Sequence, residues 1–582
     1  MKSKNLSILI VFLLCIFSVK QGNAQQWGLY TLYAPINSTQ TFLVDTNGTT
    51  YKTWTHSSSQ KTGFSVYLIP GDTLLHPVAY PTTQLTGGGM TGEVQKVTWG
   101  GTVVWDYVYS SSTYCLHHDV CPMPNGNVLL TCYEVKSAAE ATAAGCSQSM
   151  IIWSEKLMEV HPTGATTGTV VWEWHLWDHL CQNSNSGLPN YVSSISQNPQ
   201  LMNINYNTAK DWIHMNGIDY NKTLDQITFS SRTMNEIYVI DHSTTTAQAA
   251  GHTGGNSGKG GDFLYRWGNP AAIGLTGTTV FNVVHDAHWV QSDNPTYPNY
   301  LCGFNNGGGA GGKSCIDIIN PPYNGYLYSY TPGVVFPPTT YSYRHTSTYT
   351  ANSNGASQQL PNGNQLVCIS TSNYIYEINA AGTTLWSKSL TGAPANALRY
   401  SLCYVRGPIA NATASVGTIC TGSSLNLTST GVSVTETSPT YTYSWASSPA
   451  GFTSTAQNPS VTPATPGNYT YVVTITNTTL GCWDTATVKV VVNSCTGIEE
   501  SSNSMEELNL FPNPTTGIIT IGEDFTNSNN YEIIVCNAMG KIIFQGWNSK
   551  TIDLSACSEG IYYVEIKTEN SNIINKKVIL IK

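Results

Sequence analysis

Charged side chains are scarce in this sequence of 582 residues. Asp, Glu, Lys and Arg together make up 10% of it, against about 25% in an average soluble protein. That scarcity excludes coiled coils, long solvent-exposed helices and charge-rich disorder, all of which need dense charge. The charges that are present give a formal net charge of −9. Because the chain has no excess of basic residues to contact phosphates, we predict no nucleic-acid partner.

Long apolar segments are missing too, except at the N-terminus. There, Lys2 and Lys4 precede an apolar run at 6–19, and the small residues Gly22 and Ala24 stand just before Gln25. This pattern predicts a secretory signal peptide over residues 1–24, since its apolar run is too short for a retained membrane helix. No later run is long enough to cross a membrane, so we predict an exported chain without a transmembrane segment.

The sequence contains no C-x-x-C motif, which makes a cysteine-ligated zinc cluster an unfavoured interpretation. Fifteen cysteines are present, one of them in the leader, and the remainder is an even number. In an oxidising compartment some of these should be paired. Cys115 with Cys121 and Cys302 with Cys315 are candidate disulfides, because each pair flanks one loop or hairpin. The sequence alone does not fix the pairing.

A strand–turn–strand pattern repeats through the region before residue 407. Each copy has an apolar strand, a polar turn with Gly, and a second strand that ends at an aromatic residue. The six copies end at Trp54, Trp105, Trp172, Trp267, Tyr330 and Trp386. The numbers of residues between successive end positions suit four-stranded blades with variable insertions. We therefore predict an all-β chain in which residues 25–407 form a six-bladed β-propeller.

The composition changes after the predicted propeller. Residues 408–495 are rich in Ser, Thr and Val, and Cys420, Trp445 and Cys482 follow the order in which an inter-sheet disulfide packs on a buried Trp. The region resembles the Ig-like and PKD-like modules of bacterial surface proteins. We interpret it as an Ig-like β-sandwich that acts as a spacer, followed by a polar linker at 496–507.

Four motifs follow one another near the C-terminus: Leu510–Gly517, Asn537–Lys541, Leu554–Val564 and Lys576–Lys582. Their residues and order resemble the type A sorting domain of the type IX secretion system. The resemblance implies a small C-terminal β-sandwich over residues 508–582 and a partnership with the type IX secretion machinery. It also implies that the protein is extracellular or attached to the outer-membrane surface.

Three histidines share one place in the blade pattern. His118, His214 and His285 each open the first strand of a predicted blade, and the first strands of a propeller line its central channel. Arg232 follows the second strand of the His214 blade and can point to the same mouth. We therefore expect these four side chains to converge around one axial cavity.

The remaining histidines do not share that place in the blade pattern. His117 and His288 are expected to point away from the channel, because adjacent residues of a strand face opposite sides. We interpret the others as structural or surface residues: His56, His76, His161, His175, His179, His242, His252 and His345.

Three imidazoles and a guanidinium without a set of carboxylates favour an oxyanion as ligand. Two or three of the histidines could instead hold zinc or copper, but Arg232 would repel a cation and only Asp119 or Asp286 could complete the shell. We therefore predict no metal. The sequence has neither a glycine-rich phosphate loop nor a G-x-S-x-G elbow.

These segments resemble the bacterial arylsulfate sulfotransferases. The matching residues are His118-Asp119 with Asn125-Gly126-Asn127, Trp212–Asn216 with Ser230-Ser231-Arg232, and His285-Asp286-Ala287 with Phe304-Asn305-Asn306-Gly307. The resemblance covers about residues 30–405 and implies a six-bladed propeller. One departure is Asn305, where the family more often has Asp.

The resemblance also implies an activity: an enzyme that moves a sulfuryl group from an aryl sulfate ester to a phenolic acceptor, without a nucleotide donor or other cofactor. His285 matches the histidine that becomes transiently sulfated, and His118, His214 and Arg232 match the groups that hold the sulfuryl oxygens. We expect Trp212, Asn216 and Trp289 to contact the substrate.

Two other functions stay open. The first is a non-catalytic secreted propeller that binds a glycan or a protein at the cell surface. The second is a quinone-dependent redox propeller, which is disfavoured by six rather than eight repeats and by the lack of a Trp-docking motif in every blade. The sequence does not determine the sulfate donor and acceptor, the disulfide map, the oligomeric state, or whether the protein is released or anchored.

Overall fold

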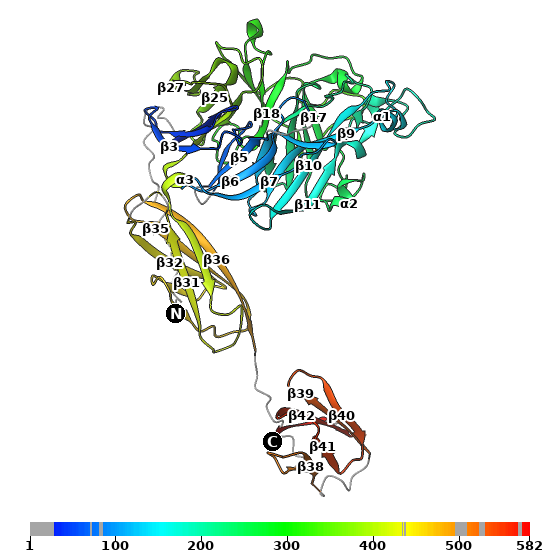
Figure 1. The fold of residues 1–582 in the computed structure, drawn as a ribbon, viewed down its shortest axis with the longest axis vertical. Coiled ribbons are helices and arrows are strands. Elements are labelled where there is room, and N and C mark those ends of the chain that lie inside the picture. The colour runs from blue at the N-terminus through cyan, green and yellow to red at the C-terminus, as the bar shows by residue number, and fades with distance from the viewer. Residues whose placement is uncertain are drawn as a thin grey trace, which may run out of the picture. The chain divides into compact units, whose positions relative to one another are not determined.

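The computed structural model describes residue 28 and residues 30–69, 73–80, 85–433, 435, 438–494, 509–522, 530–568 and 573–582. The expected signal peptide and the linker at 496–507 lie outside the described residues. The chain divides into two compact units, one made of residues up to 416 with 425–461 and 469–490, the other of 417–424, 462–468 and 491–582. Strands dominate both units (Figure 1).

Six four-stranded antiparallel sheets account for the region before residue 407. The first three are β28 (Pro394–Tyr400), β1 (Tyr30–Pro35), β2 (Gln40–Val44) and β3 (Thr50–Thr55); β4 (Tyr67–Ile69), β5 (Thr73–Ala79), β6 (Gly92–Val97) and β7 (Val103–Val108); and β8 (Tyr114–Pro122), β9 (Val128–Lys136), β10 (Ile152–Pro162) and β11 (Gly168–His175).

The other three are β14 (Met215–Asn221), β15 (Gln226–Ser231), β16 (Glu236–Asp241) and β17 (Tyr265–Trp267); β18 (Val284–Trp289), β19 (Leu301–Asn305), β20 (Cys315–Ile319) and β23 (Tyr343–Thr346); and β24 (Ala356–Gln359), β25 (Gln365–Ile369), β26 (Tyr374–Ile378) and β27 (Thr384–Ser389). The first-named strand of each sheet is the innermost. The all-β class and the count of six blades are as predicted.

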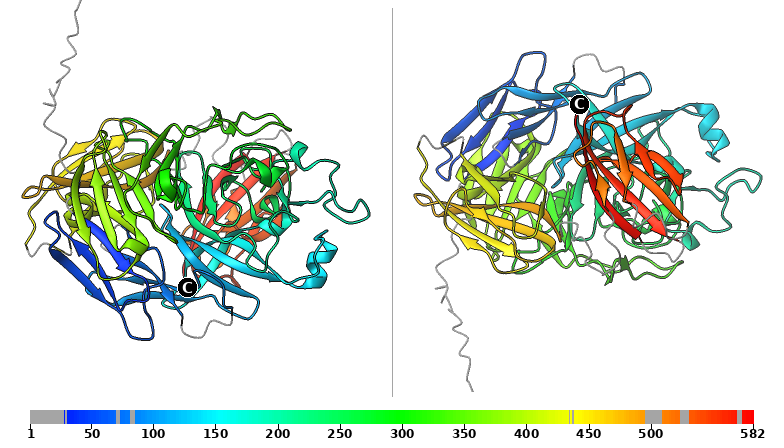
Figure 2. Two further views of the ribbon diagram at one scale, coloured as in Figure 1. Left: turned by 90° about the horizontal axis from the view of Figure 1, so that it is seen from above. Right: turned by 90° about the horizontal axis from the view of Figure 1, so that it is seen from below.

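The last strand of this region completes the first sheet. β28 pairs with β1, with Tyr30 opposite Tyr400 and Leu32 opposite Leu398. Figure 2 shows the blue N-terminal strands beside the light-green strands that precede β28 in the chain. The pairing joins the two ends of the blade series and removes the unpaired edges that an open series would expose.

Carboxylates on the innermost strands tie neighbouring blades together. Asp119 of β8 accepts a hydrogen bond from the Ile218 amide of β14 at 3.0 Å. Asp219 of β14 accepts one from the Trp289 amide of β18 at 2.8 Å. Asp286 of β18 accepts one from the Ser357 amide of β24 at 2.8 Å. These acceptors, buried in Asp119 and half-buried in the other two, fix the inner strands against one another, since breaking such a bond leaves a polar group unpaired.

Short elements fill the connections. They are the helices α1 (Ala138–Ala143), α2 (Thr246–Ala249) and α3 (Leu402–Arg406), the 3₁₀ turns η1 (Leu176–Asp178), η2 (Ile195–Gln197), η3 (Pro270–Ile273), η4 (Ala310–Gly312) and η5 (Ser370–Ser372), and the two-stranded pairs β12 (Leu180–Cys181) with β13 (Met202–Asn203) and β21 (Tyr323–Asn324) with β22 (Leu327–Tyr328). No helix among the described residues is long and apolar enough to cross a membrane.

The structure differs from the prediction in the outermost strand of the fifth blade. In the other five sheets the aromatic that ends the predicted copy lies on the outermost strand, as Trp54 does on β3. Tyr330 instead follows the small β21–β22 pair, and the outermost strand of the fifth sheet is β23. The insertion carries its own hairpin, which the repeat pattern does not separate from the blade.

Residues 409–493 form two further sheets. One has the order β29 (Ile409–Ala414), β31 (Leu425–Val432) and β34 (Ser460–Val461), and the other β30 (Thr418–Cys420), β36 (Cys482–Asn493), β35 (Gly467–Asn477), β32 (Tyr441–Ser448) and β33 (Thr453–Ser454). Trp445 of β32 is buried, as expected for the Ig-like pattern.

The disulfide map differs from the prediction. Cys482 bonds to Cys403 of α3, with 5.1 Å between their Cα atoms, and not to Cys420. The proposed pairs Cys115–Cys121 and Cys302–Cys315 are wrong, because all four of these cysteines are free and buried.

Strand geometry explains why those pairs fail. Cys115 and Cys121 lie on the same strand, β8, where six residues span about 20 Å. Cys302 and Cys315 lie opposite Ile318 and Asn305 respectively on the paired strands β19 and β20, so they stand several residues apart along the ladder. Both separations exceed what a disulfide can bridge.

The C-terminal module is a small two-sheet structure. Its sheets are β37 (Leu510–Phe511), β38 (Ile518–Ile521) and β41 (Thr551–Asp553), and β40 (Ile542–Trp547), β39 (Tyr531–Asn537), β42 (Gly560–Thr568) and β43 (Ile573–Leu580). Inward-facing residues such as Ile533, Val564 and Val578 form its separate apolar core. This arrangement agrees with the predicted small β-sandwich.

Candidate active site

One pocket is lined from all six blades. Its residues lie on, or just before, the innermost strand of each sheet: Phe64 and Ser65, His118 and Asp119, Asn216, His285 and Asp286, Asn354 to Ala356, and Ala395 and Asn396. Including its open mouth, the space between them has a volume of about 270 Å³. Since only the channel axis is common to six blades, this pocket lies on the axis.

The strand that carries His118 is locally irregular. His118 has a φ of +50°, and the register of β8 against β9 shifts between Leu116 and Val120. Such a bulge breaks the alternation of faces along a strand. His117 is not part of the pocket lining, as expected, but its ring contacts His118 and so takes part in the site from behind.

His117 lies behind His118 and links it to a buried acid. The two Nδ1 atoms are 2.9 Å apart, and Nε2 of His117 lies 2.8 Å from Oε2 of Glu155 on β10. The second oxygen, Oε1, accepts the amide of Met215 at 2.8 Å. Burial raises the pKa of Glu155 well above its usual value, and burial lowers the pKa of His117 to about 3. Both shifts favour the neutral forms, a carboxylic acid hydrogen-bonded to a neutral imidazole.

His214 packs against His118 and has its own carboxylate. The two rings have centroids 4.6 Å apart, and Nδ1 of His214 lies 2.7 Å from Oδ2 of Asp211. Although burial alone would raise it, the hydrogen bond with His214 lowers the pKa of Asp211. The ionised carboxylate therefore keeps a proton on Nδ1 of His214.

Arg232 follows β15 directly and its backbone amide donates to the carbonyl of His214 at 3.2 Å. Its half-buried side chain forms no ion pair with any carboxylate in the described part of the chain. Burial, followed by the charges of His214 and Arg232 among its neighbours, holds the pKa of His118 well below its usual value. A guanidinium without an ion-pair partner, placed beside imidazoles, is a binding group for an anion.

His285 is held in one tautomer. Its Nδ1 lies 2.6 Å from the side-chain oxygen of Asn306, just after β19, and the two amide hydrogens of Asn306 are used by the carbonyls of Ala351 and Asn354. Nδ1 therefore carries the hydrogen, and Nε2 has the lone pair, which accepts the Asn354 amide at 3.2 Å. Burial, with smaller effects of His214 and Arg232, lowers the pKa of His285 to about 3.

Two glycines bring the loop before β6 into contact with the histidines. A Cβ on Gly88 would lie 2.3 Å from Cε1 of His214, and one on Gly89 would lie 2.0 Å from Cε1 of His118. The carbonyl of Gly89 also accepts the His118 amide at 2.7 Å. Only residues without a side chain allow the backbone to come this close.

His118 and His285 line the pocket. His214 and Arg232 are outside its lining but lie close enough to lower the pKa of both, while the expected aromatic contacts lie elsewhere. Trp212 is fully buried in an apolar cluster, and Trp289 belongs to another apolar cluster; neither lines the pocket. Their positions do not support a role in substrate contact. Asn216 does line it, and the aromatic side chain present is Phe64, whose ring centroid is 5.0 Å from that of His118.

His288 stays outside the pocket lining, as expected. Its Nε2 lies 2.7 Å from the side-chain oxygen of Gln359. Asn305, the departure from the family pattern, is also away from the reacting groups: its amide donates to Asp317 at 2.8 Å. An Asp at 305 would place a second carboxylate against Asp317, so the amide suits this neighbourhood.

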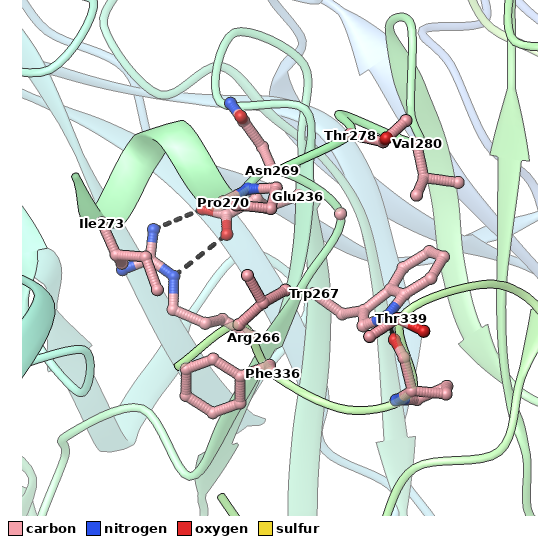
Figure 3. Close-up of a pocket in the computed structure, with 13 residues that line it drawn as sticks. Glu236, Arg266, Trp267, Asn269, Pro270, Ile273, Thr278, Val280, Phe336 and Thr339 are labelled. Atoms are coloured by element: carbon pink, nitrogen blue, oxygen red, sulfur yellow. Dashed lines mark hydrogen bonds and ion pairs between the residues drawn. The ribbon is translucent and has the colours of Figure 1, made fainter. Parts of the chain in front are cut away.

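A second pocket lies at the outer strand β17 (Figure 3) and has no histidine in its lining. Its guanidinium, Arg266, is bound to both oxygens of Glu236. Because this cation is already neutralised, the pocket offers less to an anion than the axial site does.

Sequence reasoning missed Glu155, Asn306 and Gly88. Glu155 comes from a different strand of the His118 blade, and nothing local marks it. The other two had a signal in the sequence. Asn306 lies in the Phe304–Gly307 motif, and Gly88 lies in a run of three glycines at 87–89.

Two family models match the chain. The model described as arylsulfotransferase (ASST) matches residues 18–316, just over half of the chain. The model of the secretion system C-terminal sorting domain matches residues 509–582. This sorting domain marks the protein for export, to the cell surface or the medium.

Solved structures resemble parts of the chain at low identity. A protein of unknown function from Bacteroides caccae is 9% identical with a TM-score of 0.34, over 62% of this chain and 93% of that one. A catalytically inactive virginiamycin B lyase from Staphylococcus aureus is 9% identical with a TM-score of 0.31, over 64% and 88%. The PKD1 domain of the Vibrio cholerae metalloprotease PrtV is 23% identical with a TM-score of 0.13, over 15% and 96%. No curated protein matches the chain.

Proposed function

The chain belongs to the arylsulfotransferase family, and on that premise we propose that its axial pocket transfers a sulfuryl group from an aryl sulfate ester to a phenol. The transfer proceeds through a sulfohistidine on His285 and uses no nucleotide donor. The observation that carries this proposal is the state of His285: a buried, neutral imidazole with Nδ1 bonded to Asn306. A neutral ring nitrogen with a lone pair is a competent nucleophile at neutral pH.

In the first half-reaction Nε2 of His285 attacks the sulfur of the aryl sulfate. The N–S bond forms as the S–O(aryl) bond breaks, and the electron pair of that bond leaves with the aryl oxygen. Before this attack, the hydrogen bond from the Asn354 amide to Nε2 must break. Phe64 is the aromatic side chain in the pocket that can pack on the aryl ring.

Arg232 and His214 stabilise the negative charge on the sulfuryl oxygens, while the one free N–H of His118 faces the aryl oxygen. Sulfuryl transfer resembles phosphoryl transfer, in which charge spreads over the equatorial oxygens and catalysis depends on placed positive groups. Arg232 has no competing carboxylate among the described residues, and Asp211 holds His214 as a donor. Loss of one such placed donor costs on the order of 10²–10³ in rate.

The chain Glu155–His117–His118 supplies the proton for the leaving group. In its first state the Glu155 hydroxyl donates to Nε2 of His117, whose Nδ1 hydrogen donates to Nδ1 of His118, so that Nε2–H of His118 faces the pocket. When this hydrogen moves to the departing phenolate, the other two protons shift along the chain. Glu155 becomes a carboxylate, and Nε2 of His118 is left with a lone pair.

The second half-reaction reverses these steps. Nε2 of His118 takes the proton of the acceptor phenol, and the phenol oxygen attacks the sulfur of sulfo-His285. The N–S bond breaks, and the protons return to Glu155. Donor and acceptor bind in turn to one pocket, so the kinetics are ping-pong.

The test is intact-mass analysis of the purified chain after incubation with 4-nitrophenyl sulfate and no acceptor. We expect the mass of one sulfuryl group on the protein, its loss on adding phenol, and no label in His285→Ala. His161→Ala, an exposed histidine outside the pocket, is the matched control and should label normally. A labelled His285→Ala would move the nucleophile, and no label or turnover in the unaltered chain would favour the non-catalytic binding function.

A further inference from the structure

A second group of ligand-type side chains lies at the outer edge of the third and fourth sheets. His179 follows η1, just beyond the outermost strand β11, and His252 and Asp262 lie in the loop between α2 and β17. Oδ1 of Asp262 is 2.9 Å from Nδ1 of His179 and 2.7 Å from Nδ1 of His252. One ligand atom from each residue lies within 4.8 Å of the others.

The His179 ring lies between two hydrogen-bond acceptors. Its Nε2 is 2.8 Å from the carbonyl oxygen of Ala249, which can only accept, so Nε2 carries the hydrogen. In the neutral ring Nδ1 then has a lone pair, and this lone pair faces the Asp262 carboxylate. Two electron-rich atoms at this separation need a positive charge between them: a second proton on the ring, or a metal ion bound by both.

The position of His252 favours the metal ion over the second proton. Its side chain is 59% exposed, so packing does not hold it, yet its Nδ1 points at the same oxygen as that of His179. Two imidazole nitrogens converging on one carboxylate oxygen are a common ligand set for a divalent transition metal. A second proton on His179 would account for its contact with Asp262, whereas His252 brings another imidazole nitrogen within 2.7 Å of the same oxygen.

The loop that carries two of the ligands is closed by backbone hydrogen bonds. The Gly261 amide donates to the Gly251 carbonyl at 2.9 Å, and the Gly260 amide donates to the Gly254 carbonyl at 3.0 Å. The Gly261 carbonyl accepts Nε1–H of Trp174 at 2.8 Å, and the Trp174 ring stacks on His179. The orientation of His179 is therefore fixed by surrounding contacts, as in built metal sites.

Close packing at the loop leaves no room for a larger residue at 261. A Cβ on Gly261 would lie 2.5 Å from Nε2 of His179 and 2.0 Å from the Ala249 oxygen. The same backbone approach that orients His179 thus also brings Asp262, the next residue, to its Nδ1.

We propose that His179, His252 and Asp262 bind one divalent transition-metal ion, with Zn²⁺ the ion that suits two imidazoles and a carboxylate. Zinc bound at about 2.0–2.2 Å from each donor needs donor atoms farther apart than they are here, roughly 3.3 Å. The exposed His252 ring can move to give that spacing on its side and opens the entry path. The buried Asp262 carboxylate has to move about 0.4 Å farther from Nδ1 of His179. Water occupies the open position, and the ion ties the loop of residues 250–262 to the end of β11.

The proposal is tested on the full chain after removal of metal with EDTA. Zinc is added, the protein is passed through a desalting column, and bound zinc is measured by plasma mass spectrometry, together with the thermal unfolding midpoint. We expect about one zinc ion per chain, a higher midpoint with zinc, and loss of both effects in His252→Ala and Asp262→Asn.

Matched measurements make the outcome decisive. His161→Ala removes another exposed histidine and should keep the zinc. Cobalt added in place of zinc should give the visible absorption of a four-coordinate ion in the unaltered chain and not in His252→Ala. Equal zinc content in the unaltered chain and His252→Ala, or no binding in either, overturns the proposal. Labelling of His285 is independent of these results.

Discussion

At the scale of single residues, the reactivity proposed for the site comes from partners rather than from the histidines themselves. Asn306 fixes which nitrogen of His285 is free, and Glu155 fixes how protons reach His118. Both partners are buried or nearly so, where an unsatisfied polar atom is costly and a single tautomer is therefore enforced.

Asn306→Ala should slow labelling of His285 by about 100-fold, because the ring loses the acceptor that holds hydrogen on Nδ1 and can turn its lone pair away. The measurement is the rate of sulfuryl incorporation at saturating 4-nitrophenyl sulfate. Asn306→Asp should retain more of the rate, since a carboxylate still accepts from Nδ1. Equal losses in both variants would point to a structural role only.

Glu155→Gln should slow turnover by on the order of 10², because an amide can hydrogen-bond to His117 but cannot give up and regain a proton. The effect on the rate of sulfuryl incorporation, measured without an acceptor, should depend on the leaving group: small with 4-nitrophenyl sulfate, whose phenolate needs no acid, and large with phenyl sulfate. The measurement is a leaving-group series with the unaltered chain as reference. A uniform loss across the series would contradict the proton path.

The ring of His285 should stay neutral well below the usual imidazole value of about 6.5. Burial, with Arg232 and His214 close by, lowers its pKa to about 3, so protonation is complete only below that pH. NMR of histidine-labelled protein, with the His285 signal assigned by its loss in His285→Ala, should show no titration between pH 7 and about pH 4.5. A midpoint near 6.5 would show that the site is solvated.

At the scale of elements, the bulge in β8 and the glycine loop before β6 form the site together. The bulge turns His118 into the pocket while His117 stays behind it. Gly88 and Gly89 lie against His214 and His118. Strain and close packing of this kind are typical of functional sites.

Gly88→Ala should reduce activity more than stability. The added methyl group meets the His214 ring at 2.3 Å, so the ring has to move away from the sulfuryl oxygens. We expect about a 10-fold or greater loss of kcat/KM, with a small change in the thermal midpoint. Gly101→Ala is a poor control because of its positive φ, whereas Gly100→Ala, in a turn with open space, should leave activity unchanged.

At the scale of the whole molecule, the modules combine a catalytic propeller with a sandwich and a sorting domain. The Cys403–Cys482 disulfide ties the α3 segment that follows the propeller to strand β36 of the sandwich. It closes a loop with a sequence separation of 79 residues. A cross-link over a loop of this length restricts the unfolded chain considerably.

Cys403→Ser should therefore lower the free energy of unfolding of the sandwich, by up to about 4 kcal/mol. The measurement is chemical unfolding followed by a sandwich probe such as Trp445 fluorescence, while His285 labelling reports the propeller. Labelling should be unchanged, because the pocket is built from the six blades. Cys368→Ser, a buried free cysteine of the propeller, is the control that should leave the sandwich transition in place.

Much of the architecture follows from the sequence by itself. The repeated hairpins, the placement of His118, His214 and His285 on or next to innermost strands, and the motifs near Leu510 and Gly517 are local patterns of spacing. Strand period and turn chemistry act over a few residues, so they can be recognised without knowing what packs against them.

Only the tertiary structure decided which distant groups meet. Glu155 beside His117, Asn306 beside His285, Cys403 paired with Cys482, and Asp262 between two histidines all join residues that are far apart in the chain or hidden by irregular backbone. A bulge reverses the face on which a side chain lies, and long-range pairing depends on how whole blades stack. Neither effect produces a periodic pattern in the sequence, because each is decided by the packing of one strand against another.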